Sequence, residues 1–208
     1  MLQAMEALSA NQIYHLMTQT VIPRPIAWVL TDSSPAGEEQ GNYNLAPFSY
    51  FTPICSAPPL LLFSVGKKPN GDIKDTTRNV KAHGKMVVHI AATASSEAMT
   101  ASAATLDHGE SEVAVNNIAL VDFADFDLPR VADCPIAFGC SLYQLQEIGD
   151  TPQSLIIAEI EQVHIDPSVI DPSTDRLKVD ALKVDPIARL GGGEYSSLAE
   201  TFAVQRPK

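Results

Sequence analysis

The chain reads NLAPFSYFTPICSAPP over residues 44–59, and the hydrophobic run LLLFSV, residues 60–65, follows directly. Small, hydroxyl and aromatic side chains make up the first part, a composition that fits a strand and its exit loop. A proline within a strand is confined to a sheet edge or a bulge, which is where we expect Pro47. This stretch therefore predicts two strands, residues 43–51 and 60–65, the first of them at an edge or carrying a bulge.

The remaining segments continue this pattern of short strands joined by connections that contain Pro and Gly. Further strands are expected at residues 26–31, 85–91, 136–146 and 155–165, and helices at 11–17, 75–83 and 96–104. In the second helix we expect Asp75 to be the N-cap and Gly84 the C-terminal stop. Strands outnumber helices and do not alternate with them, which predicts a mainly β fold with short helices and an antiparallel sheet closed into a barrel. Several strands are apolar on both faces, so helices or a second subunit should cover the outside of the barrel.

Size and charge narrow the class of protein. The 208 residues favour a single domain over residues 1–208, with an acidic irregular excursion at about 106–130 and a C-terminal extension after about 166. The net charge of -11 comes without any cluster of Lys and Arg, which argues against a nucleic-acid partner. No run reaches the roughly 18 apolar residues of a membrane span, and no signal-peptide pattern opens the sequence. We therefore expect a cytoplasmic protein with no membrane partner.

A second informative segment, KDTTRN, occupies residues 74–79. Lys74, Thr76 and Thr77 would lie at the start of a helix, where free backbone N–H groups and the helix dipole favour an anion such as phosphate. An ordinary capped helix with a solvated lysine is the alternative interpretation, and residues 44–50 taken alone could be core or a protected edge. Together the two segments suit a ligand with a flat ring at one end and a phosphate at the other, as in flavin mononucleotide (FMN).

Familiar catalytic and metal-binding motifs are absent from the sequence. Residues 66–71 have the glycine spacing of a P-loop, but Asp72-Ile73 stand where Lys and Ser or Thr are required. There is no Gly-x-Gly-x-x-Gly fingerprint, no Cys-x-x-Cys pair and no histidine spacing typical of a metal site. His89, inside a strand, is expected to be structural. We accordingly name no catalytic residue and expect no metal.

Several ordered motifs give the chain a resemblance to a known family. They are VIPRPIAWV (21–29), NLAPFSYF (44–51), PPL (58–60), KDT (74–76) with Asn79, and RLGG (189–192) with Tyr195. This set resembles the flavin reductase-like family with an FMN-binding split barrel, in particular its flavoredoxins and the flavin-reductase components of two-component monooxygenases. The similarity runs from about Tyr14 to Tyr195. It implies a Greek-key split barrel and a homodimer with one FMN per subunit near the interface.

The resemblance also implies which residues bind the cofactor. Those expected to meet the flavin ring and ribityl chain are Asn44, Ala46, Pro47, Phe48, Ser49, Tyr50, Ser64, Val65 and Gly66. Those expected at the phosphate are Lys74, Asp75 and Thr76, while Arg189 and Tyr195 are placed near the flavin. Arg24 and Arg189 are candidates for a cation at the N1 and O2 edge of the flavin, the alternative being ordinary surface ion pairs.

Two functions remain open at this point. The first is NAD(P)H-dependent flavin reductase activity, in which NADH or NADPH passes a hydride to flavin N5 and the reduced flavin serves a monooxygenase. The second is a flavoredoxin-like electron carrier with tightly bound FMN, which exchanges electrons with a redox partner protein without direct use of nicotinamide. A binding module that has lost redox use is a third reading. The sequence does not separate the first two.

Overall fold

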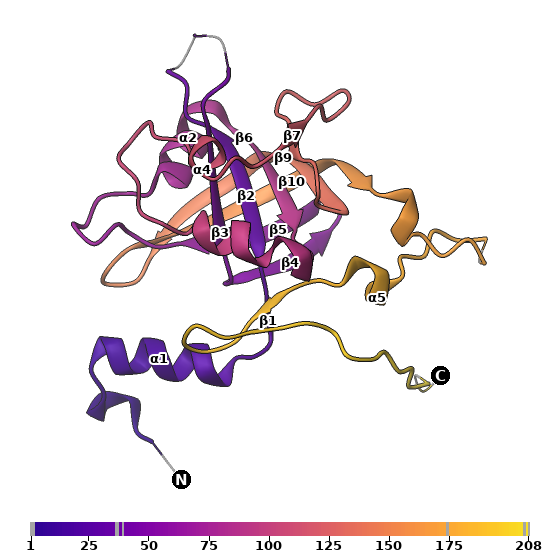
Figure 1. Ribbon diagram of the computed structural model, residues 1–208. Coiled ribbons are helices and arrows are strands. Elements are labelled where there is room, and N and C mark those ends of the chain that lie inside the picture. The colour runs from indigo at the N-terminus through magenta and orange to yellow at the C-terminus, as the bar shows by residue number, and fades with distance from the viewer. Residues whose placement is uncertain (1–2, 36–37, 39, 174, 206, 208) are drawn as a thin grey trace.

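A computed structural model describes residues 3–35, 38, 40–173, 175–205 and 207 (Figure 1). Its main feature is a seven-stranded antiparallel sheet with the strand order β3-β2-β6-β9-β10-β5-β4. The strands of this sheet are β2 (Ala27–Asp32), β3 (Tyr43–Phe48), β4 (Phe51–Ser56), β5 (Pro59–Val65), β6 (Lys85–Ile90), β9 (Ile136–Ile148) and β10 (Gln153–Ile165). The prediction of a mainly β fold with short helices is confirmed.

The sheet closes on itself through a corner of two residues. Strands β3 and β4 stand at opposite ends of the hydrogen-bonded order, yet only Ser49 and Tyr50 separate them in the chain. At this corner the backbone N–H of Ser64 in β5 donates to the carbonyl of Tyr50 at 2.9 Å. The single strand predicted for residues 43–51 is therefore wrong at its end, because the chain turns there to reach the far side of the barrel. Pro47 lies on an end strand, as its missing N–H requires.

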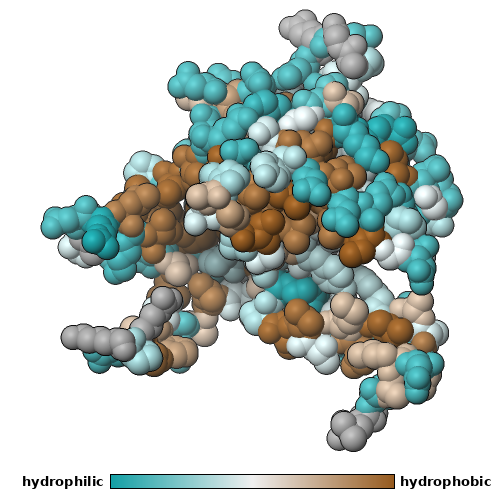
Figure 2. All heavy atoms as spheres, turned by 180° about the vertical axis from the view of Figure 1, so that it is seen from behind, coloured by the Kyte–Doolittle hydropathy of each residue, from teal (hydrophilic) through white to brown (hydrophobic). Residues whose placement is uncertain are grey.

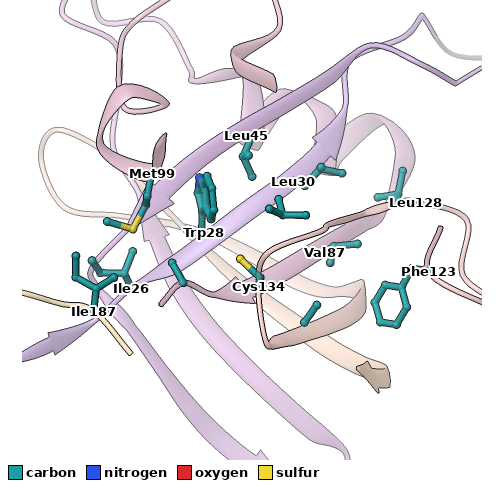
Figure 3. Close-up of a cluster of buried hydrophobic side chains, with 13 residues drawn as sticks. Ile26, Trp28, Leu30, Leu45, Val87, Met99, Phe123, Leu128, Cys134 and Ile187 are labelled. Atoms are coloured by element: carbon teal, nitrogen blue, oxygen red, sulfur yellow. The ribbon is translucent and has the colours of Figure 1, made fainter. Parts of the chain in front are cut away.

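Two hydrophobic clusters occupy the two faces of the sheet. The barrel core consists of Ala27, Val29, Phe48, Leu61, Phe63, Val65, Val80, Met86, Val88, Cys140, Ile156 and Ala158. The outer core consists of Ile26, Trp28, Leu30, Leu45, Val87, Ala91, Met99, Phe123, Leu128, Val131, Cys134, Ala137 and Ile187 (Figure 3). The first four residues of β2 alternate between the two clusters, and the polar Thr31 and Asp32 that follow are buried as well. This explains why the strand reads as apolar on both faces.

The cover of the outer core comes from the segment between β6 and β9. It contains η2 (Thr93–Ser95), α3 (Ser96–Ala101), α4 (Glu112–Val115), β7 (Leu120–Val121) and β8 (Arg130–Val131). Trp28 Nε1 donates to Ser102 Oγ at 2.9 Å, which joins this segment to β2. Residues 106–130, expected as a surface excursion, are largely irregular, but they bury Phe123 and Leu128. The excursion thus forms part of the packed structure.

Helix α2 (Asp75–His83) contributes Val80 to the barrel core. It ends at Gly84, whose φ of 71° is the left-handed conformation expected of a C-terminal stop. Its N-cap is Lys74, so the assignment of Asp75 as N-cap is wrong by one residue. The Asp75 carboxylate points instead to Lys68, whose Nζ lies 2.9 Å away, and to His108 Nδ1 at 2.7 Å. It accepts hydrogen bonds from outside the helix because both donors approach it from loops.

The two ends of the chain form a separate layer beside the barrel. Helix α1 (Ala10–Thr20) lies apart from the sheet next to the C-terminal segment (Figure 1). The other elements here are η1 (Met5–Ala7), β1 (Arg24–Pro25), η3 (Pro167–Val169), α5 (Ala181–Val184), β11 (Ala188–Arg189) and β12 (Tyr195–Ser196), and β1, β11 and β12 make a small sheet. Among the helices that the structure describes, none combines the length and the apolar character needed to cross a membrane.

Arg24 holds this outer layer together. It is only 5% exposed, and its guanidinium donates to the carbonyls of Thr18, Val21 and Leu190, the last two at 2.8 Å. These acceptors lie at the end of α1, just after it, and in the C-terminal segment. Arg24 therefore bonds to backbone carbonyls, and among the described residues it forms no ion pair with a carboxylate.

His89 is a buried structural residue of β6. Its Nδ1 lies 2.9 Å from the carbonyl of Trp28, and its Nε2 accepts the backbone N–H of Val131 at 2.9 Å. These two contacts assign a neutral ring with the proton on Nδ1. Burial lowers the pKa of His89 from 6.5 to about 4, because no water reaches the ring to solvate a charge.

The lowered pKa of His89 predicts a loss of stability on acidification. The folded state favours the neutral ring, so its contribution is complete above pH 6.5 and declines as pH falls towards about 4. Between pH 7 and 4.5 this amounts to about 2–3 kcal/mol of the free energy of unfolding. His89→Gln should be less stable at pH 7 but lose less on acidification, as measured by urea unfolding at both pH values. Parallel pH profiles for the two proteins would contradict this role.

Candidate functional site

Three cavities meet at Pro47, beside the corner that closes the barrel. The inner cavity, about 60 Å³, lies between β3, the start of α2 and residues 102–106. The large cavity, about 650 Å³, lies between α1, the corner and the end of β5. The tail cavity, about 280 Å³, lies between α1, α3 and the C-terminal segment. Pro47 lines all three, while Lys68 and Lys74 line both the inner and the large cavity.

The structure brings all but one of the predicted cofactor residues to these connected cavities. In the inner cavity are Asn44, Ala46, Pro47, Lys74, Asp75 and Thr76. In the large cavity are Pro47, Phe48, Ser49, Tyr50, Ser64, Gly66 and Lys74. Arg189 and Tyr195 line the tail cavity together with Pro47 and Ser49. The exception is Val65, whose side chain is fully buried in the barrel core.

Side-chain contacts join the two predicted segments. Asn44 Nδ2 donates to Thr76 Oγ1 at 3.2 Å, which connects β3 to the first turn of α2. Asn79, part of the same motif, donates from Nδ2 to Thr31 Oγ1 at 3.0 Å and to Ser33 Oγ at 2.8 Å. Asn79 thus fixes α2 against β2 and does not line the cavities. The KDTTRN motif therefore serves both the cavity and the attachment of its helix.

Lys74 is the charge at the junction of the inner and large cavities. Its Nζ lies 5.9 Å from the centre of the Phe48 ring, and no carboxylate pairs with it within the part of the chain that the structure describes. Burial, and then the positive charge of Lys68, lower the pKa of Lys74. An anion between the two lysines would relieve both effects, since it compensates the lost hydration and the repulsion. The site thus fits a phosphate.

Sequence reasoning missed several residues of the site. Lys68 donates to Asp75 and to the carbonyl of Leu106 at 3.4 Å, and it comes from what read as a plain loop. Glu112, 6% exposed, accepts the backbone N–H of Leu45 at 3.1 Å, and burial raises its pKa. Glu112 satisfies a donor of the end strand β3 that has no further strand to pair with. No local motif marks either residue, because both contacts are long-range.

The tail cavity has a cation and an aromatic ring in contact. The guanidinium carbon of Arg189 lies 4.5 Å from the centre of the Tyr195 ring, and its Nη2 donates to the carbonyl of Gly192 at 2.7 Å. The Tyr195 hydroxyl lies 3.0 Å from Thr100 Oγ1 on α3. A cavity wall is therefore built by two segments far apart in the sequence. In the described residues, no group of three or more His, Cys, Asp or Glu side chains is arranged to bind a metal.

Comparisons with known proteins agree with this arrangement. Over 206 residues the chain is 36% identical to the uncharacterised protein YwrF of Bacillus subtilis, with 97% of each chain covered. The structure is similar to nitrilotriacetate monooxygenase component B from Bacillus cereus, with a TM-score of 0.87, 29% identity and 98% of each chain covered. A protein of Shewanella frigidimarina with a split barrel domain superposes with a TM-score of 0.83, 20% identity and full coverage of both chains. This last likeness concerns the fold alone, and it confirms the split barrel.

The family follows from a match along most of the sequence. The family model described as flavin reductase like domain matches residues 17–177. That range includes β2 to β10, the corner at Ser49 and Tyr50, and the KDTTRN helix start. The chain belongs to the flavin reductase-like domain family.

Proposed function

We propose that this protein binds FMN in the inner and large cavities and acts as an NAD(P)H-dependent flavin reductase. The observation that carries the proposal is Lys74, a half-buried cation without a carboxylate partner in the described chain, at one end of an aromatic-lined cavity. Membership of the flavin reductase-like family supports it. So does the 29% identity with a protein described as a monooxygenase component.

The cavities fit the size and polarity of this cofactor. Ligand sites of drug-sized molecules are about 300–1,000 Å³, and the large cavity is within that range. Lys74 makes no capping hydrogen bond with its side chain, so the first N–H groups of α2 are not capped by their N-cap residue. Those groups and the two lysines would hold the phosphate. Phe48, Ser49 and Tyr50 would then line the ring end.

Bound flavin supplies the redox chemistry, accepting a hydride from NAD(P)H at N5. The protein's own contribution is placement. Gly66 lies where an added Cβ would come 3.1 Å from Gln153 Oε1, so the absence of a side chain lets Gln153 pack closely at this wall. Arg24 Nε donates to Ser49 Oγ at 3.4 Å, which makes it a positioning residue for the corner. We assign no catalytic residue, because hydride transfer between stacked rings needs no side-chain acid or base.

A homodimer is part of the proposal. Several large apolar side chains of α1 and the corner are exposed, among them Tyr14, Met17 and Tyr50. Seen from behind, hydrophobic residues gather over the barrel and on the outlying layer beneath it (Figure 2). Apolar surface of this kind commonly marks an interface. A second subunit placed there would cover the open side of the large cavity.

The phosphate assignment predicts a strong dependence of FMN affinity on Lys74 and Thr76. Replacing both by Ala should weaken FMN binding about tenfold or more, since a charge-assisted hydrogen bond contributes about 1.5–3 kcal/mol. Riboflavin, which has no phosphate, should bind equally to both proteins and more weakly than FMN does to the native one. Calorimetric titration of apoprotein measures all four affinities.

Lys81→Ala is the matched control for this test. Lys81 is in the same helix, is half-exposed, pairs with Glu147 at 3.3 Å and lines none of the three cavities. Lys81→Ala removes one positive charge, as Lys74→Ala does, and should leave the FMN affinity unchanged. An FMN affinity in the double variant equal to that of the native protein would place the phosphate elsewhere.

The reductase proposal predicts that NADH or NADPH bleaches the flavin. Under anaerobic conditions, addition of either nucleotide should lower the flavin absorbance of the FMN-loaded protein at about 450 nm. Stopped-flow absorbance gives the rate with each. A protein that keeps oxidised FMN with both nucleotides, yet is reduced by a chemical or protein donor, would favour the flavoredoxin-like electron carrier.

Cofactor retention should depend on the dimer. Dilution that dissociates the subunits should release FMN, because one wall of the large cavity would open to water. Sedimentation velocity with detection at a flavin wavelength follows both events together. A monomer that keeps all its FMN would refute the interface placement and leave the phosphate site standing.

A further inference from the structure

The tail cavity is a separate compartment next to the proposed flavin site. Its apolar surface comes from Tyr14, Pro47 and Ala103, because Ile26 and Met99, which also line it, are only 4% and 0% exposed. It shares Tyr14, Pro47 and Ser49 with the large cavity, so a molecule in one would lie beside a molecule in the other. At about 280 Å³ it is just below the size of sites for drug-sized ligands, which suits a molecule of one ring.

Arg189 gives this compartment a positive charge. The chain carries 25 acidic and 14 basic residues, yet no carboxylate forms an ion pair with Arg189 in the portion described. A guanidinium has five N–H donors, and the carbonyl of Gly192 is the one acceptor recorded for them there. In so acidic a protein, a partly buried arginine that no carboxylate neutralises is available to bind an anion from outside.

The geometry of Arg189 is fixed before any ligand arrives. One face of its guanidinium rests on the Tyr195 ring, and the contact of Tyr195 with Thr100 orients that ring. A planar donor group held in this way loses little freedom on binding, and its fork matches the two oxygens of a carboxylate. The remaining walls offer apolar surface for a ring rather than further charge.

We propose that the tail cavity binds a small aromatic carboxylate, with its ring against Tyr14 and Pro47 and its carboxylate on Arg189. The inference rests on the proposed function only for the identity of the neighbouring ligand, because the carboxylate would lie next to the flavin if FMN fills the large cavity. Arg189 and Tyr195 then form a second binding site, distinct from the phosphate site at Lys74. The competing interpretation is that Arg189 only braces the C-terminal segment through Tyr195 and Gly192.

Benzoate and its neutral analogue benzamide separate these interpretations. Saturation-transfer NMR and calorimetry on the FMN-loaded protein should give benzoate at least tenfold tighter binding than benzamide. Arg189→Gln should weaken benzoate tenfold or more and leave benzamide unchanged. Arg189→Lys, which keeps the charge but not the planar fork, should give an intermediate benzoate affinity. Lys183→Gln, which removes one charge from an exposed position on α5, should match the native protein.

Three results would overturn the proposal. They are equal affinities for benzoate and benzamide, a benzoate affinity that survives Arg189→Gln, and stoichiometric release of FMN by benzoate, which would put Arg189 in the flavin site. The benzoate and benzamide titrations can also be made on the apoprotein, without flavin. Failure to bind FMN would therefore refute the proposed function while the contrast between benzoate and benzamide still tests the second site.

Discussion

The rest of the structure depends on the closure of the barrel by a two-residue corner. Strands β3 and β4 pair with opposite ends of the sheet, and a two-residue link spans so little distance that the sheet must curl until those ends meet. Residues 44–50 must therefore lie where the two ends of the sheet meet. All three cavities open there, at Pro47, because a closing corner cannot be packed as densely as the middle of a sheet.

The second constraint is electrostatic. Removing Arg24 would leave three backbone carbonyls, from two segments, without their donor in a nearly dry environment. The same side chain reaches Ser49 at the corner, so one guanidinium links the barrel directly to the outer layer. Gly191 belongs to this arrangement, because an added Cβ there would lie 2.3 Å from Gln19 Cγ on α1. Because Gly191 has no side chain, the backbone of the tail can approach α1 this closely.

Much of the fold could be predicted because its signals are local. The strands at β2, β5, β6, β9 and β10, and helices α1 and α2, follow from apolar runs, caps and glycine stops, and all lie close to their predicted ranges. The break at Ser49 and Tyr50 could not be predicted, since nothing in a strand-like stretch reports where it changes partner. Asp75 was misplaced by one residue, since its carboxylate contacts Lys68 and His108 rather than the first N–H groups of the helix.

The candidate site divides in the same way. Asn44, Lys74 and Thr76 belong to contiguous motifs, and the sequence indicated them. Glu112 and Lys68 were missed because the contacts of Glu112 with Leu45 and of Lys68 with Leu106 cross the fold. The carbonyl acceptors of Arg24 were not foreseen because every residue carries such a group. Val65 was included by its position in a motif, but strand alternation turns its side chain into the barrel core.

The contact between Arg24 and Leu190 also has a consequence for biosynthesis. The two residues are separated by 166 positions, so the contact between α1's end of the chain and the tail can form only after almost the whole chain has been made. The outer layer is therefore completed late in translation, and a prematurely terminated chain would form the barrel without the contact between Arg24 and Leu190.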